Sequence, residues 1–576
     1  MENRSPRSSI LAIAMSLLLL LVALASLFGQ SASVVAGAGT SLTADTALTS
    51  HASIRIDSDQ ELAAEAAVEH WPGNGSLTDP YIIENLKVNG TGSYNAIFIG
   101  NVSACLVIAN CSVSGASSAD TNGYPYHYGA GISICNVTGI VTIQNNLCNE
   151  NGEGIFVYGS NGLRLINNTC NDNNFDGIYL NGSRSGTIQN NICSGNINTG
   201  IYLAGSSLDN SISGNTCSTE GYGIYLYRSG TNRLSNNVCK GDGHGMFLGS
   251  SGNSTVTGNI CQGGTNSGIT LVASNSSVVS GNTCNSNGDY GIWLDTSSND
   301  TLSSNICDDN IDGILLGGSH SNTVNGNVCG SNNYTGIHLF SSWSNVLTGN
   351  TCDYNGQYGV YLYSASINNT VQTNTCDGNV DVGIYLYNSG TENVLRANSC
   401  DDNGHYGIYL SSSNRTAIKD NLCRTNGHYG IYLNSSSMNT VQGNTCNDNN
   451  ETGILLYLKC DNNTISGNTC NDNAAKGICL LKACNDNTIS GNTCSGDGEG
   501  ISVDVTSVGN SVSANLVGSS SSNYDWVWFG AGAAIVLAIL LGVLLTRRRK
   551  KREAARKKRK SGRCCSWTQG TIVHGQ

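Results

Sequence analysis

A cysteine returns every 22 to 24 residues through most of this chain, and this regular spacing limits the fold more than any other feature. Sixteen cysteines follow the rule, at positions 148, 170, 193, 217, 239, 261, 284, 307, 329, 352, 376, 400, 423, 446, 470 and 494. Each has an Asn two positions before it, and a Gly followed by an aliphatic residue or Met six or seven positions after it. A fixed period of this length predicts a solenoid, in which each repeat packs on its neighbours.

Each repeat contains two segments that read as short strands. One is represented by Gly200–Leu203 (GIYL), in which apolar and outward-facing residues alternate. The other is represented by Asn463–Cys470 (NTISGNTC). The residues between them are Asn, Asp and Gly, which tolerate the left-handed backbone of tight corners. No part of the repeat has a helical apolar period, so the pattern favours one turn of a parallel β-helix and excludes a helix–strand repeat.

The repeat resembles those of a known family. Its N-x-C and G-I-x-L elements are similar to the right-handed parallel β-helix repeats of NosD-like and carbohydrate-binding or sugar-hydrolase proteins, over about residues 70–515. The segment Trp71–Gly90 also resembles the entry segment of archaeal surface proteins of this kind. The resemblance implies an all-β, right-handed parallel β-helix solenoid of about 18 rungs. Lyases, hydrolases, epimerases, adhesins and maturation factors share this repeat, so it does not fix the function.

Stacking gives the cysteines a structural role. Equivalent positions of successive rungs lie about 4.8 Å apart, so the sixteen cysteines should form one buried column, because Cys behaves as a small hydrophobe. The Asn residues should form a second column whose amides bond to one another. Disulfides between rungs and a thiolate metal column remain alternatives. The pair best placed for a disulfide is Cys460 and Cys484, each seven residues after the Gly of its rung.

Membrane signals flank the repeats. An apolar run from Ile10 to Phe28 follows Arg4 and Arg7, which predicts a signal peptide or signal anchor over residues 1–38. Residues 526–546 are mostly apolar and are followed by RRRKKR, which predicts a transmembrane helix with a basic cytoplasmic tail over 547–576. The expected location is the cell membrane, with a single pass and the large domain outside.

Three segments lie between these two ends. Residues 39–80 form an N-terminal segment with a helical cap, because Ser58 to Glu61 reads as a capping box before an alanine-rich stretch. Residues 81–516 hold the parallel β-helix repeats, and 517–525 form a serine-rich linker to the membrane.

Charge excludes one class of partner. Of 28 Lys and Arg, 12 lie between Arg547 and Arg563 and two precede the first apolar run. That leaves 14 basic residues against 38 of the 40 acidic residues in the region between. Such a surface disfavours nucleic acid and tolerates cations.

Four consecutive rungs place titratable residues at one corner, two positions before the rung's Gly. The residues are Asp381, His405, His428 and Glu451, which stacking would bring into a row. Such a row could bind Ca²⁺ or another divalent metal, or act as acid and base in catalysis. Solvated polar corner residues would give the same pattern.

Aromatic residues recur two positions after the Gly and face outward by alternation. The candidate carbohydrate-binding residues among them are Tyr202, Tyr225, Trp293, Tyr361, Tyr385, Tyr409 and Tyr432. Aromatic rings can stack on the apolar faces of sugar rings. High strand propensity alone would also explain them.

The motifs of known β-helix hydrolases are incomplete here. The Asn-Thr-Asp, Asp-Asp, Gly-His-Gly and Arg-Ile-Lys series typical of polygalacturonases is out of order, and its last member is missing. We therefore expect a membrane-anchored surface protein that binds a polysaccharide or surface glycan, or supports the envelope, without catalysis. The alternatives are a polysaccharide lyase, hydrolase or epimerase, and a NosD-like metal-delivery or maturation factor.

Overall fold

The computed structural model describes residues 48–117 and 129–518. The predicted signal, transmembrane helix and cytoplasmic tail lie outside these residues. Within the two described stretches, no helix combines the length and apolar character needed to cross a membrane.

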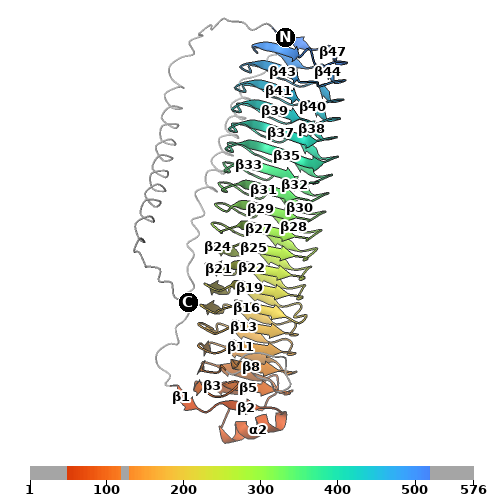
Figure 1. Cartoon of the computed structure of the whole chain (residues 1–576). Coiled ribbons are helices and arrows are strands. Elements are labelled where there is room, and N and C mark those ends of the chain that lie inside the picture. Colours follow the sequence, from red (N-terminus) through yellow and green to blue (C-terminus); the bar gives the residue numbers. More distant parts are fainter. Residues whose placement is uncertain (1–47, 118–128, 519–576) are drawn as a thin grey trace, which may run out of the picture. The chain divides into compact units, whose positions relative to one another are not determined.

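The chain folds into a right-handed parallel β-solenoid of about 19 turns (Figure 1). Within each sheet, strands of successive turns pair in parallel. The largest ladder, here called the long sheet, contains β2 (Ile54–Ile56), β5 (Ile97–Gly100), β8 (Ala130–Cys135), β11 (Glu153–Tyr158), β13 (Asp176–Asn181), β16 (Thr199–Ala204), β19 (Tyr222–Tyr227), β22 (His244–Gly249), β25 (Ile269–Val272), β27 (Tyr290–Asp295), β29 (Asp312–Gly317), β31 (Thr335–Phe340), β33 (Tyr358–Tyr363), β35 (Val382–Gly390), β37 (Tyr406–Ser413), β39 (Tyr429–Asn434), β41 (Thr452–Tyr457), β43 (Lys476–Leu481) and β46 (Glu499–Val503).

A second ladder runs beside the long sheet and is called the short sheet. It contains β3 (Tyr81–Glu84), β6 (Leu106–Ala109), β9 (Val141–Gln144), β12 (Arg164–Ile166), β14 (Thr187–Gln189), β17 (Ser211–Ser213), β20 (Arg233–Ser235), β23 (Thr255–Thr257), β26 (Val278–Ser280), β28 (Thr301–Ser303), β30 (Thr323–Asn325), β32 (Val346–Thr348), β34 (Thr370–Gln372), β36 (Val394–Arg396), β38 (Ala417–Lys419), β40 (Thr440–Gln442), β42 (Thr464–Ser466), β44 (Thr488–Ser490) and β47 (Ser511–Ser513).

The third side of the solenoid carries the cysteines and is called the cysteine sheet. Isolated parallel bridges, such as Thr283 with Ile306, continue it where no full strand forms. Its strands are β1 (Thr49–His51), β4 (Leu86–Asn89), β7 (Ser112–Ser114), β10 (Leu147–Cys148), β15 (Ile192–Ser194), β18 (Thr216–Ser218), β21 (Val238–Lys240), β24 (Ile260–Gln262), β45 (Thr493–Cys494) and β48 (Leu516–Val517).

The predicted cysteine column is confirmed. Cys193, Cys217 and Cys239 are direct partners in successive strands, and all sixteen repeat cysteines are buried. They complete a core formed by the Ile and Leu side chains of the long sheet and the central aliphatic residue of each short-sheet strand. Burial raises the pKa of thiols such as Cys329 and Cys352, so it favours the uncharged form. The column therefore acts as apolar packing.

The asparagine column is confirmed as well. Asn327 donates from its amide to Asn350 Oδ1 at 2.9 Å and to the carbonyl of Leu302 at 3.1 Å. It accepts from the backbone and side-chain nitrogens of Asn305, both at 2.9 Å. Each member thus closes a corner by bonding to the turns on both sides, which satisfies polar groups that would be costly to leave unpaired.

A second asparagine ladder, three residues after the cysteine in twelve of the sixteen repeats, was not predicted. Asn332, Asn355 and Asn379 bond in sequence at 3.1 and 3.0 Å. Glu220 and Asp242 interrupt this ladder as buried carboxyls, with Glu220 Oε2 and Asp242 Oδ2 lacking a hydrogen-bond partner in the structure. Burial raises the pKa of both groups, so their neutral forms are favoured.

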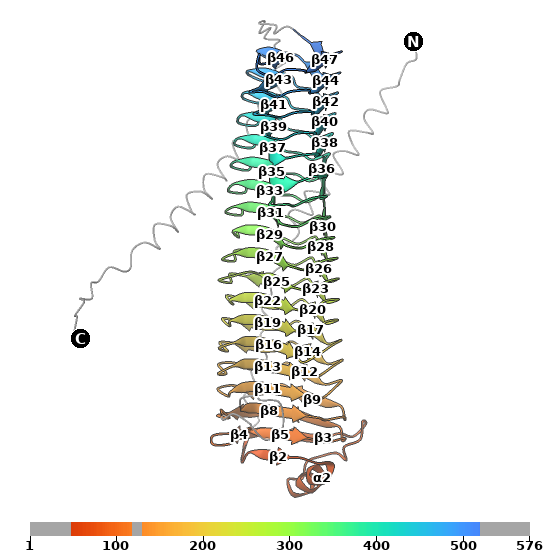
Figure 2. The same ribbon diagram turned by 45° about the vertical axis from the view of Figure 1, so that its right-hand side comes forward.

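The predicted helical cap is present as α2 (Asp59–Val68), at the end of the solenoid where β2 lies (Figure 2). Ser58 Oγ accepts from the backbone nitrogen of Glu61 at 3.2 Å, as a capping box requires. The solenoid begins earlier than the predicted residue 81, because β1 and β2 precede the helix and pair with β4 and β5. The helix thus belongs to the first turn.

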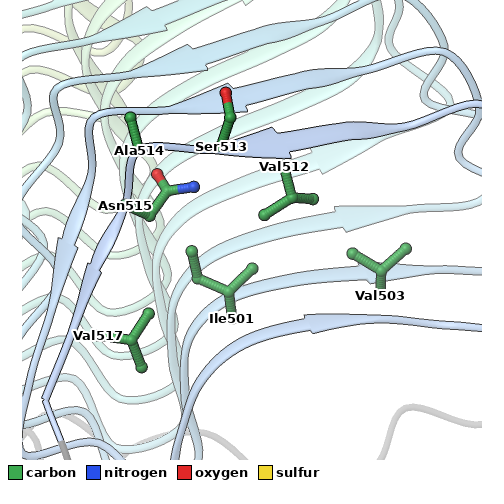
Figure 3. A pocket seen from close by; sticks show the side chains of 7 residues that line it. All are labelled: Ile501, Val503, Val512, Ser513, Ala514, Asn515 and Val517. Carbon is green, nitrogen blue, oxygen red and sulfur yellow. The ribbon is translucent and has the colours of Figure 1, made fainter.

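The opposite end exposes the last layer of the core. Ile501, Val512 and Val517 line a cavity of about 440 Å³ (Figure 3). Val517 is 52% exposed, whereas Cys494, its partner in the preceding turn, is fully buried. No element of the described chain follows β48 to cover this end.

Candidate functional site

The predicted aromatic residues share one column on the outer face of the long sheet. Register pairs Tyr202 with Tyr225, and Tyr361, Tyr385, Tyr409 and Tyr432 with one another in turn. The column, here called the aromatic ladder, is less exposed than expected from the sequence, since Tyr361 is only 8% exposed.

The reason is that the tyrosine rings stack on each other. The Tyr385 and Tyr409 centroids lie 4.7 Å apart at an interplanar angle of 2°, and those of Tyr409 and Tyr432 lie 4.7 Å apart at 6°. Tyr202 and Tyr225 stack similarly, at 5.0 Å and 15°. Inside such a stack both faces of a ring are in use, so a ligand meets ring edges and hydroxyl groups.

The aromatic ladder is interrupted at two positions. Thr270 and Leu315 take the place of rings, and Trp293 lies in the column between them. Trp293 therefore has no stacked ring above or below it in the ladder, and its one recorded ring contact is with Tyr290, tilted by 57°. Its faces are not used by ladder stacking.

A cavity of about 510 Å³ opens beside Trp293, and it is here called the notch. Its central strand, β29, contributes Leu315 and Gly317. The strands on either side carry Trp293 and Asp295 on β27, and His338 and Phe340 on β31, in the same two columns. The notch exists because β29 has no ring at 315 and no side chain at 317.

One wall of the notch holds an acid–imidazole pair that was not predicted. His338 Nδ1 lies 3.1 Å from Asp312 Oδ2, and Asp312 Oδ1 accepts from the backbone nitrogen of Thr335 at 3.0 Å. The His338 ring also stacks on Tyr361, with centroids 4.9 Å apart. Asp312 lies one position before the Gly of its turn, whereas His338 lies two positions after the Gly of the next turn. The two residues therefore belong to different columns, and a comparison within one column could not predict their contact.

The predicted corner row forms as expected. His405 Nδ1 lies 2.6 Å from Asp381 Oδ1, His428 Nδ1 lies 2.5 Å from Glu451 Oε1, and the two imidazole centroids are 5.1 Å apart. A carboxylate can only accept, so each Nδ1 carries a proton, and in the neutral imidazole Nε2 is then the acceptor. These side chains are largely open to solvent; that of His405 is 52% exposed.

The corner row is linked to the aromatic ladder through two tyrosines. Tyr406 and Tyr429 stack with centroids 5.3 Å apart, and Tyr406 also contacts Tyr409 and Tyr432 of the ladder. The pKa of the Tyr429 hydroxyl is raised, mainly by burial and secondly by the neighbouring Glu451. The hydroxyl therefore stays protonated at neutral pH.

Cys460 and Cys484 occupy adjacent turns as predicted, and both are free thiols in the structure. Each takes the place of a serine in a buried ladder of hydroxyl groups. Cys460 Sγ accepts from the backbone nitrogen of Ser436, and Cys484 Sγ from that of Cys460, both at 3.4 Å. The equivalent serines, such as Ser319 and Ser342, accept the same bond. The disulfide stays a prediction.

Comparison with models of known protein families shows which family the chain belongs to. The family model described as "Periplasmic copper-binding protein (NosD)" matches residues 80–263, 208–382 and 376–528, which together cover most of the solenoid. This chain belongs to the NosD family. No curated protein sequence matches it.

Solved structures share the β-helix architecture with this NosD-family chain. The A-module of mannuronan C-5 epimerase AlgE6 from Azotobacter vinelandii is 12% identical to this chain, with a TM-score of 0.24. The match covers 72% of this chain and 91% of the epimerase chain. The periplasmic alginate epimerase AlgG is 14% identical, covering 81% and 85%, with a TM-score of 0.27. A PL6 alginate lyase in complex with a trisaccharide is 13% identical, covering 66% and 86%, with a TM-score of 0.31. At these scores the similarity carries no argument about function.

The copper in the family's description was tested against the residues present. The corner row offers two imidazole nitrogens, and the repeat cysteines are buried in the core. No group of three or more His, Cys, Asp or Glu side chains in residues 48–117 and 129–518 is arranged to hold a metal ion. Copper sites in proteins are built from several converging His, Cys or Met ligands, so the described residues do not fit such a site.

Proposed function

We propose that this NosD-family solenoid is a cell-surface protein that binds a polysaccharide through the outer face of its long sheet, without cleaving it. The observation that carries the proposal is the aromatic ladder and its interruption at Trp293. Rings and tyrosine hydroxyls follow one another on a rigid sheet, and this combination suits a ligand with apolar ring faces and many hydroxyl groups.

The proposal includes attachment to the membrane. The described chain ends at Gly518, and only seven residues separate it from the apolar run that starts at Trp526. With positive residues following the apolar run, the solenoid would be outside the cell and the tail inside.

Catalysis is the second candidate, and the corner row favours it. Two imidazoles, each held by a carboxylate, leave their Nε2 atoms free to accept a proton, which is the role of a general base in a lyase or an epimerase. The row lies beside Tyr406 and Tyr429, whose hydroxyls could donate a proton.

One experiment separates the two candidates. The full chain in detergent is incubated with a panel of polysaccharides, with and without Ca²⁺, and the products are analysed by mass spectrometry while retention of the polymer is measured by affinity electrophoresis. A variant with Ala at Asp381, His405, His428 and Glu451 is run in parallel. We expect retention without new oligosaccharides from both proteins. Products formed by the natural chain and absent from the variant would establish the enzyme.

A further inference from the structure

We propose that the notch between Trp293 and His338 is a binding subsite for one pyranose ring that carries no anionic group, either a neutral sugar or an amino sugar. This inference rests on the proposed glycan-binding function and narrows it to one place and one class of sugar.

The shape of the notch suits a single ring. Its volume of about 510 Å³ falls in the range of small-molecule sites, roughly 300–1,000 Å³. Leu315 lies between Trp293 and His338 in one column, and Gly317 lies between Asp295 and Phe340 in the next. The site is thus open on the face of the sheet and bounded along the solenoid axis on both sides.

The walls supply apolar contacts that the tyrosine stacks cannot offer. The faces of Trp293 are not used by ladder stacking, and Phe340 is 43% exposed, with its recorded ring contact on the side of Tyr363 in the next turn. Sugar rings present C–H faces that pack on such aromatic surfaces. Ladder rings such as Tyr385 are stacked on both sides, whereas Trp293 has no stacked ladder ring and lines the notch.

The carboxylates of the notch are hydrogen-bond acceptors, so a bound ligand would have to supply hydrogen-bond donors. Asp295 and Asp312 are carboxylates, which only accept when ionised. Asp312 already accepts from Thr335 and pairs with His338, whereas the Asp295 side chain has no partner among the described residues. A hydroxyl or ammonium group of a sugar would satisfy Asp295, and a uronate carboxylate would be repelled by it.

Charge around the notch reinforces this selection. The sequence contains no Lys or Arg between Lys240 and Arg396, although it contains Asp289, Asp295 and Asp312 there. Lys240 is three turns from the notch along the solenoid, or roughly 14 Å at about 4.8 Å per turn. That separation exceeds the Debye length of about 8 Å at physiological ionic strength. An anionic sugar would find no Lys or Arg side chain to bind.

The test uses calorimetric titration of the full chain in detergent with hexamers of glucose, glucosamine and mannuronate. Gly317→Val fills the notch, and an added Cβ would meet no atom closer than 3.8 Å, so the strand can accept it. Ala204→Val adds bulk to the same column outside the notch and is the matched control. Trp293→Ala removes the aromatic wall of the notch and serves as a second variant.

We expect the glucose or the glucosamine hexamer to bind at least about tenfold more tightly than the mannuronate hexamer. Gly317→Val and Trp293→Ala should each weaken this binding about tenfold or more. Ala204→Val should leave the affinity unchanged. Equal or tighter binding of mannuronate would overturn the sugar class. Unchanged binding by both notch variants would overturn the location while leaving the proposed function intact. No binding of any hexamer or polysaccharide by the natural chain would reject the proposed function itself.

Discussion

Trp293 and His338 occupy the same column of the long sheet two turns apart, and the residue between them in that column is Leu315. From Tyr361 to Tyr432 the column is an unbroken stack of rings, as Tyr385 on Tyr409 shows. The interruption converts a continuous stack, whose ring faces are occupied, into a recess with aromatic walls. The candidate site is therefore defined by the side chains that this turn lacks.

Removing one rung of the first asparagine ladder should destabilise the fold. Asn327→Ala leaves the Asn305 backbone nitrogen and amide and the Leu302 carbonyl without their partner. Each buried group left unpaired costs about 1–3 kcal/mol, so we expect a loss of roughly 3–5 kcal/mol in the free energy of unfolding. Urea denaturation measures it. Asn325→Ala, at an exposed position of the same repeat, is the control and should change little.

Replacing the buried acid of the second ladder should remove a pH dependence. Burial raises the pKa of Asp242 to about 7, above its unfolded value near 4, so the folded state binds the proton more tightly. The stabilisation is complete below pH 4 and is lost as pH rises towards 7. We expect Asp242→Asn, which restores the ladder residue, to stabilise residues 216–249 by about 2–4 kcal/mol at pH 8 and very little at pH 4.

Local hydrogen exchange at several pH values measures the Asp242→Asn effect, because stacked turns can open separately. Asp209→Asn, on an exposed corner, is the control. An equal gain at pH 4 and pH 8 would contradict a titrating Asp242.

The cysteine column should resist modification in the folded protein. Among the described cysteines, Cys105 is the one that is not fully buried. Alkylation under native conditions, with sites located by mass spectrometry, should label Cys105 and leave the sixteen repeat cysteines unlabelled, because buried uncharged thiols are poor nucleophiles. Rapid labelling of a central member such as Cys307 would contradict a closed core.

The state of Cys460 and Cys484 can be decided by substitution. If both are free thiols in the hydroxyl ladder, replacing both with Ser recreates the usual ladder residue, and stability should change by less than about 1 kcal/mol. If they form a disulfide that closes a loop of this length, the same change should cost roughly 3 kcal/mol under oxidising conditions. Thermal unfolding with and without reductant distinguishes the two results.

Repetition made the fold readable from the sequence. The spacing of residues such as Cys307 and Asn305 gave the turn length, and alternation around each Gly gave the long-sheet strand. The second asparagine ladder is also visible in the sequence, since Asn310 follows Cys307 by three residues as its equivalents do in most other repeats. The residues before each cysteine, which predict the first ladder, carry no information about it.

The candidate site was harder to predict. Sequence places Tyr385 and Tyr409 in one column, but whether their rings stack or splay depends on side-chain rotamers and on neighbours in adjacent turns. The pairing of Asp312 with His338 runs diagonally between two columns. The notch depends on the missing side chain at Gly317. This role can be inferred only when Asp295 and Phe340 are known to lie on either side of Gly317 in the sheet.

A crystal structure of the protein soaked with a neutral or amino-sugar hexamer tests the central claim most directly. We expect density for a sugar ring packed against Trp293, over Leu315 and Gly317, with a hydroxyl or amino group within hydrogen-bond distance of Asp295. Ordered sugar at the corner row of His405 and His428, with the notch empty, would contradict it.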